Sequence, residues 1–160
     1  MGIFGGIKTA KSTEGGLYFA AGDRYVVEIQ RIKSDKTRKG IPFFVVECKI
    51  LHSYNGKMAK GTQPSWMVTL DKDAALGNIK QFVEAVMGVD MNQVSDVEAE
   101  QSVEMICGSE QPLAGDIVVT ETWNKDTQAG GKFTRHKWML PSEDDYKAAG
   151  LTPPAASTVG

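Results

Sequence analysis

Few residues in this chain are suited to metal or redox chemistry. Only two of the 160 residues are cysteine and two are histidine. Cys48 and Cys107 lie far apart, and each fits an apolar pattern, so both are expected to be buried small residues. His52 and His136 have no metal-ligand spacing. We therefore expect no disulfide framework, no metal and no cofactor, and a reduced, cytoplasmic protein.

Long hydrophobic runs and catalytic motifs are absent as well. No run of about 18 apolar residues occurs, which excludes a membrane-spanning helix, and residues 1–6 do not resemble a secretory signal. Gly56-Lys57 lacks the upstream glycine and the following Ser or Thr of a phosphate loop. On a strand, Cys48 and His52 would be about 13 Å apart, too far to share a proton. The sequence predicts that the protein is not an enzyme.

Charge is plentiful but unevenly distributed. The net charge is −2, yet residues 1–70 hold eleven Lys and Arg against five Asp and Glu. Residues 71–113 hold two Lys against nine Asp and Glu. The basic block carries strand patterns and the acidic block carries helical ones. Such a separation indicates a charged partner, which the net charge by itself would not.

The hydrophobic pattern predicts a mixed α+β protein that is mainly β. Alternating or continuous apolar residues predict strands over 23–32, 41–52, 65–70, 117–123 and 132–140, with polar loops over 33–40 and 124–131. Apolar residues at helical spacing predict a helix that is capped by Asp71 or Asp73 and ends at Gly88. A second helix begins at Ser95, in capping-box spacing with Glu98, and runs to about residue 106.

This element order is that of the OB-fold, a Greek-key barrel that binds oligonucleotides on one sheet face and on its loops. We expect a five-stranded OB-like barrel over residues 23–141, with a helical insert at about 74–107 between the third and fourth strands. Residues 1–22 are expected to form a flexible arm. Residues 142–160 are acidic and then rich in Pro and Ala, which predicts a disordered tail.

Basic and aromatic residues recur together in three β units. Lys and Arg neutralise phosphates, and aromatic rings stack on bases. The candidate nucleic-acid-binding residues are Arg31, Lys33, Lys36, Arg38, Lys39, Phe43, Tyr54, Lys57, Lys60, Trp66, Trp123, Lys125, Lys132, Arg135 and Lys137. Lysine-rich turns also protect strand edges, and rings such as Trp66 and Trp138 are individually more often core residues. Trp123 and Tyr54 abut turns and are the better stacking candidates.

Four segments carry a resemblance to a known family: Gly2-Ile3-Phe4-Gly5-Gly6-Ile7-Lys8, Pro64-Ser65-Trp66-Met67-Val68, Gly77-Asn78-Ile79-Lys80-Gln81-Phe82 and Trp138-Met139-Leu140-Pro141. With them the chain resembles the small single-stranded DNA-binding proteins of bacteriophage replication and recombination modules, which have OB-type cores. The resemblance implies coating of exposed strands with low sequence preference, in the host cytoplasm. The non-acidic end, Ala155 to Gly160, departs from the acidic termini of many such proteins and does not favour recruitment of partners by the tail.

The leading hypothesis is therefore sequence-tolerant binding of single-stranded DNA. The alternative is a structural or adaptor protein, such as a virion component or a protein-binding module, with no nucleic-acid role. On that view the basic loops and the acidic helix would pair across the interface of a homo-oligomer. With DNA binding, the acidic helix or tail is instead the expected contact for replication or recombination proteins. A nuclease is the third hypothesis.

Overall fold

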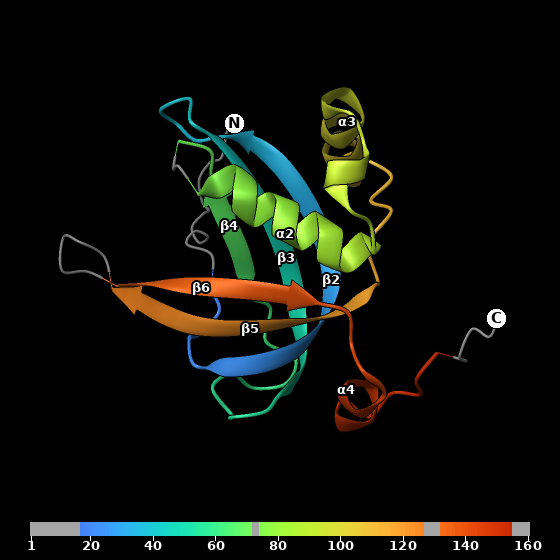
Figure 1. The fold of residues 1–160 in the computed structure, drawn as a ribbon. Coiled ribbons are helices and arrows are strands. Elements are labelled where there is room, and N and C mark those ends of the chain that lie inside the picture. Colours follow the sequence, from blue (N-terminus) through green and yellow to red (C-terminus); the bar gives the residue numbers. More distant parts are fainter. Residues whose placement is uncertain (1–16, 72–73, 127–131, 155–160) are drawn as a thin grey trace.

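The computed structural model describes residues 17–71, 74–126 and 132–154 and contains one five-stranded antiparallel sheet (Figure 1). The strands are β2 (Asp23–Lys36), β3 (Pro42–Ser53), β4 (Ser65–Thr69), β5 (Ile117–Asp126) and β6 (Lys132–Met139), in the spatial order β4-β3-β2-β5-β6. The helices are α2 (Ala75–Met87), the short 3₁₀ helix η1 (Met91–Gln93), α3 (Asp96–Ile106) and α4 (Glu143–Ala148). The predicted α+β class and the helices between the third and fourth strands are confirmed.

The hairpin of β2 and β3 is longer than predicted. A loop was expected from residue 33, but β2 continues to Lys36, which pairs with Pro42. The turn is closed by Thr37, whose N–H donates to the carbonyl of Ile41 at 2.8 Å, and Gly40 has a φ of 83°. Polar residues extend the strand here because alternate side chains of an exposed hairpin face solvent without disturbing the backbone ladder.

The hydrophobic core lies between the sheet and α2. Phe82 and Val83 of α2 are completely buried and pack against Phe44 and the two indoles of Trp66 and Trp138. The ring centroids of Phe82 and Trp138 are 4.9 Å apart at 85°, an edge-to-face contact, and those of Trp66 and Trp138 are 5.3 Å apart. Trp66 and Trp138 are therefore core residues, which agrees with the expectation that such rings more often pack in the core than stack on bases.

The ends of the helices test the capping predictions. Ser95 and Glu98 form the predicted capping box of α3, and Gly88 ends α2 with a φ of 67°. The N-cap residue of α2 is Ala74, which makes no side-chain cap bond, so the predicted N-cap at Asp71 or Asp73 is wrong; Asp73 itself lies outside the described residues.

The sheet is not closed into a barrel, in contrast to the prediction. Among the described residues, its two edge strands β4 and β6 share no backbone ladder. Each edge instead meets another part of the chain. The N–H of Ser65 on β4 donates to the carbonyl of Leu17 at 2.7 Å, and the side-chain amide of Gln81 on α2 bonds both the N–H and the C=O of Trp138 on β6. The strand edges are separated because these contacts and the core rings lie between them.

The two predicted terminal segments are more ordered than expected where the structure describes them. Phe19, within the expected arm, is 4% exposed and packs on Tyr25 and Trp138; residues 1–16 lie outside the described residues. The expected tail contains α4, which has Ser142 as N-cap. Asp145 of α4 is buried and accepts hydrogen bonds from Arg24 at 2.8 and 3.3 Å. Residues 155–160 lie outside the described residues.

Candidate nucleic-acid interface

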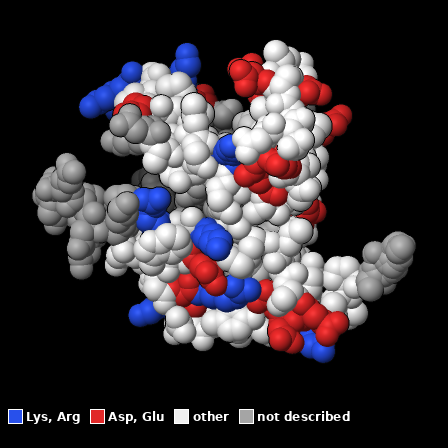
Figure 2. All heavy atoms as spheres, viewed as in Figure 1, with Lys and Arg blue, Asp and Glu red and all other residues white. Residues whose placement is uncertain are grey.

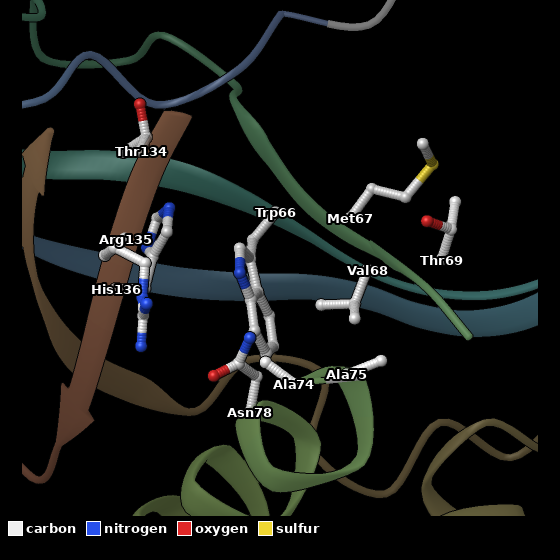
Figure 3. A pocket seen from close by; sticks show the side chains of 10 residues that line it. All are labelled: Trp66, Met67, Val68, Thr69, Ala74, Ala75, Asn78, Thr134, Arg135 and His136. Carbon is white, nitrogen blue, oxygen red and sulfur yellow. The ribbon is translucent and has the colours of Figure 1, made fainter. Parts of the chain in front are cut away.

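The gap between β4 and β6 forms a cleft of about 500 Å³. It is lined by Trp66, Met67, Val68 and Thr69 of β4, Ala74, Ala75 and Asn78 at the start of α2, and Thr134, Arg135 and His136 of β6. Figure 3 shows the β4 and β6 residues on opposite sides of the space, with α2 below them. Most of the lining is apolar, and Asn78, Thr134, Arg135 and His136 supply polar groups.

The cleft continues past Trp66 toward the start of the described chain. A second hollow of about 230 Å³ is lined by Tyr18, Phe19 and Ser65 together with Trp66, Met67, Thr134 and His136. The two hollows share the last four residues and therefore form one groove along the open edges of the sheet. Tyr18, at one end of this groove, is 57% exposed, so its ring is accessible to a ligand.

The β6 side of the cleft is held rigidly. The Gln81 amide accepts from the N–H of Trp138 at 2.9 Å and donates to its carbonyl at 2.8 Å, as a neighbouring strand would. His136 stacks on Trp138 with centroids 5.6 Å apart, and its Nδ1 lies 2.9 Å from the hydroxyl oxygen of Thr120. Burial lowers the pKa of His136 to about 3, so the imidazole is neutral at physiological pH. The cleft therefore offers neutral polar groups and ring faces.

The β2–β3 tip, residues 36–41, stands beside one end of this cleft. Its side chains Lys36, Arg38 and Lys39 are all exposed. Figure 2 shows Lys and Arg gathered over this tip and along β6, with Asp and Glu over α3 and α4 on other parts of the same face. Three of the predicted phosphate-binding residues are therefore brought together at the edge of the cleft.

Three further candidates from the first unit lie on the face of β2 and β3 that is turned away from α2. Lys33 is paired in register with Val45, and its Nζ is 3.4 Å from Glu47 Oε2. Arg31 is exposed and lies opposite Glu47, and Phe43 lies opposite Asp35. The charges of Arg31 and Lys33 are partly balanced by Glu47, so this face is less basic than the tip.

The hairpin of β5 and β6 supplies the most accessible indole. Trp123 is 44% exposed and lies opposite Arg135 in the strand register, so the two side chains share one face. Lys137 is exposed on the same face, opposite Glu121. Lys125 and Lys132 are strand residues at the far end of this hairpin, and their side chains lie outside the described part of the structure.

The loop after β3 does not join this group. Tyr54 is 42% exposed, but its hydroxyl donates to Asp145 Oδ1 at 2.6 Å, and the Arg24 guanidinium lies 5.8 Å from the ring centroid. Its ring thus forms part of the contact with α4. Lys57 and Lys60 are exposed in the same loop, which follows the end of β3 opposite to the β2–β3 tip.

The sequence analysis did not predict three residues that line the cleft: Asn78, Thr134 and His136. Thr134 and His136 alternate with Arg135 and Lys137 along β6, and that alternation was a usable signal for a second, inward face. The sequence could not place Asn78, because its position depends on how α2 packs between two strands that are distant in the chain.

The comparisons with known proteins give no family for this chain. Neither a family model nor a curated protein matches the sequence. Among the residues that the structure describes, no group of His, Cys, Asp and Glu could hold a metal ion, and no helix is long and apolar enough to cross a membrane.

Proposed function

We propose that this protein binds single-stranded DNA in the cleft between β4 and β6, with the phosphates held by the β2–β3 tip and by the β5–β6 hairpin. The observation that carries the proposal is the open cleft itself, which has ring faces and neutral polar groups inside and basic side chains at its margins. Sequence-tolerant binding of a flexible strand needs this combination of stacking surfaces and positive charge.

The topology supports the same proposal. Three strands, a helical insert and a two-stranded hairpin, with the first strand central, form the strand order of an OB-type domain opened between its third and fifth strands. In that fold the oligonucleotide lies against the sheet between the loop joining the first two strands and the loop joining the last two. Here these positions correspond to the β2–β3 tip and to residues 127–131, the latter outside the described residues.

The proposed path runs across the cleft and onto the β5–β6 hairpin. Arg135 is the connecting residue, because it lines the cleft and also lies opposite Trp123. A strand leaving the cleft would meet the exposed indole of Trp123 and then Lys137. Bases would stack on Tyr18 and Trp123, whereas Trp66 lines the groove from within the core and Trp138 is buried behind it.

The test is a titration of the full chain with a fluorescent oligo-dT at several salt concentrations. Each phosphate that the protein neutralises should add about −0.7 to the slope of log affinity against log salt. The double-stranded oligonucleotide of the same length should bind more weakly at every salt concentration. Absence of binding at low salt, or equal affinity for both forms, would refute the proposal.

A pair of matched variants tests the path. Arg38→Ala with Lys39→Ala removes two positive charges from the β2–β3 tip, and the slope should become less steep by about 1.4, which is two phosphate contacts. Lys57→Ala with Lys60→Ala removes the same charge from the loop at the other end of β3 and should leave the slope unchanged. If the second variant loses as much as the first, the strand does not follow the cleft.

A further inference from the structure

Helix α3 packs on the rest of the protein with only one of its faces. Its inward stripe consists of Ala99, Ser102, Val103 and Ile106, of which Ile106 is fully buried. The outward face contains two large apolar side chains, Val97 at 61% and Met105 at 53% exposure. Glu100 and Glu104 are exposed near them, at helical spacing from Val97. An outward face with apolar side chains among carboxylates is suited to contact another surface.

Among the described residues the outward carboxylates of α3, Glu100 and Glu104, form no ion pair, although Lys80 of α2 reaches the preceding η1, where its Nζ donates to Asn92 Oδ1 at 2.8 Å. Residues 88–110 contain six Asp and Glu and no Lys or Arg. The ion pairs of the described residues involve Arg24, Lys33 and Lys147, and none of them reaches α3. The acidic face of α3 therefore favours a basic partner surface.

The same molecule has a surface that complements α3. The β2–β3 tip presents Lys36, Arg38 and Lys39, and apolar residues adjoin it: Pro42 is exposed, and Leu70, whose N–H donates to the Pro42 carbonyl, is 36% exposed. Figure 1 shows the tip and α3 at the same end of the molecule but apart from each other, with α2 running from the side of the tip toward α3. They can therefore meet between copies.

We propose that α3 of one copy docks on the β2–β3 tip of a second copy. The contact can be made twice, reciprocally, within a two-fold dimer, or once per pair, which leaves one surface of each kind available for the next copy. A small contact dominated by exposed charges is weak and strongly dependent on salt. The proposal does not rest on nucleic-acid binding, and α3 and DNA would compete for the same tip.

Sedimentation of the full chain without nucleic acid tests this docking. At about 10 mM salt, where the screening length is about 30 Å, the mean mass should rise steadily with protein concentration. At about 1 M salt, where that length is about 3 Å, the protein should sediment as a monomer. A monomer under both conditions, or a mass that does not change with salt, would overturn the proposal.

A charge exchange identifies the two surfaces. Glu100→Lys with Glu104→Lys takes the charge of α3 from −4 to zero and makes its outward face basic between Val97 and Met105, and Arg38→Glu with Lys39→Glu takes the charge of the tip from +3 to −1. Each double variant alone should stay monomeric at low salt, because its two surfaces no longer attract each other. An equimolar mixture of the two should associate again, because the basic outward face of α3 in one matches the acidic tip of the other.

The control variant is Glu143→Lys with Asp144→Lys, which makes the same change of net charge on α4 and should associate as the original chain does. Circular dichroism shows whether each variant is folded. If folded variants do not recover association when mixed, α3 and the tip are not partners. Since no DNA is present, that result would leave the oligonucleotide titration unaffected.

Discussion

Lowering the pH should destabilise this protein through His136. Burial holds the pKa of this imidazole at about 3 in the folded protein, whereas in the unfolded chain it has its ordinary value of 6.5. Below pH 6.5 the unfolded chain binds a proton that the folded protein does not. The contribution of the neutral imidazole to stability is thus complete above pH 6.5 and is lost as the pH falls toward 3.

The size of this loss of stability follows from the one proton that the unfolded chain binds and the folded protein does not. Between these two pKa values the free energy of unfolding should fall by about 1.4 kcal/mol for each pH unit. From about pH 7 to about pH 5 the total is about 2 kcal/mol, in a range above the ordinary titration of carboxylates. The loss is a substantial fraction of the stability of a small domain.

Urea unfolding followed by tryptophan fluorescence at about pH 7, 6 and 5 measures this loss. His136→Gln keeps a polar side chain beside Thr120 but cannot titrate, so its free energy of unfolding should lose this pH dependence. The control is His52→Gln, which removes the other histidine, one that lies outside the cleft. This variant should keep the pH dependence of the free energy of unfolding. A stability that is flat over this range in the original protein, or a folded-state imidazole resonance of His136 that titrates near 6.5, would refute the reasoning.

Three more predictions concern single side chains. Hydrogen bonds from Arg24, Tyr54 and Ser142 outweigh the effect of burial and lower the pKa of Asp145 to about 2. Asp145→Asn should therefore lower the free energy of unfolding near neutral pH by about 2 kcal/mol in urea, and the difference should vanish as the pH falls from about 4 to about 2. Trp123→Ala should weaken oligo-dT binding by about 1–3 kcal/mol while urea stability stays unchanged. Gln81→Leu leaves the backbone groups of Trp138 unpaired and should lower stability by about 1–3 kcal/mol, measured by the same unfolding assay.

Local pattern was sufficient for most of the secondary structure. The capping box at Ser95 and Glu98 involves residues three apart, and the end of α2 at Gly88 depends on one backbone conformation. Both were predictable because the groups that decide them are close in sequence. Helix α4 was missed although Ser142 and Asp145 form the same kind of capping box, a usable local signal. What the sequence could not show is that its Asp145 pairs with Arg24, which is 121 residues away.

The candidate site was only partly predictable. Basic character at Lys36, Arg38 and Lys39 and exposure of Trp123 follow from their turn and hairpin positions. The sequence favoured Trp123 over Trp66 as a stacking ring because Trp123 abuts a turn, but it kept Trp66, which is 8% exposed, among the candidates because its strand pattern does not show what covers it. Burial depends on what covers a strand face, and α2 covers that of Trp66.

The amino-acid sequence by itself determined the order of strands and helices, the separation of a basic β part from an acidic helical part, and the capping of α3. These properties depend on residue type and on neighbours within a few positions. Only the tertiary structure decided that β4 and β6 stay apart, that Asn78 of α2 and His136 of β6 line the same cleft, and that the hydroxyl of Tyr54 bonds Asp145 of α4. Such contacts join residues that are distant in the chain, and their free energy comes from packing and hydrogen bonding that exist only after the chain has folded.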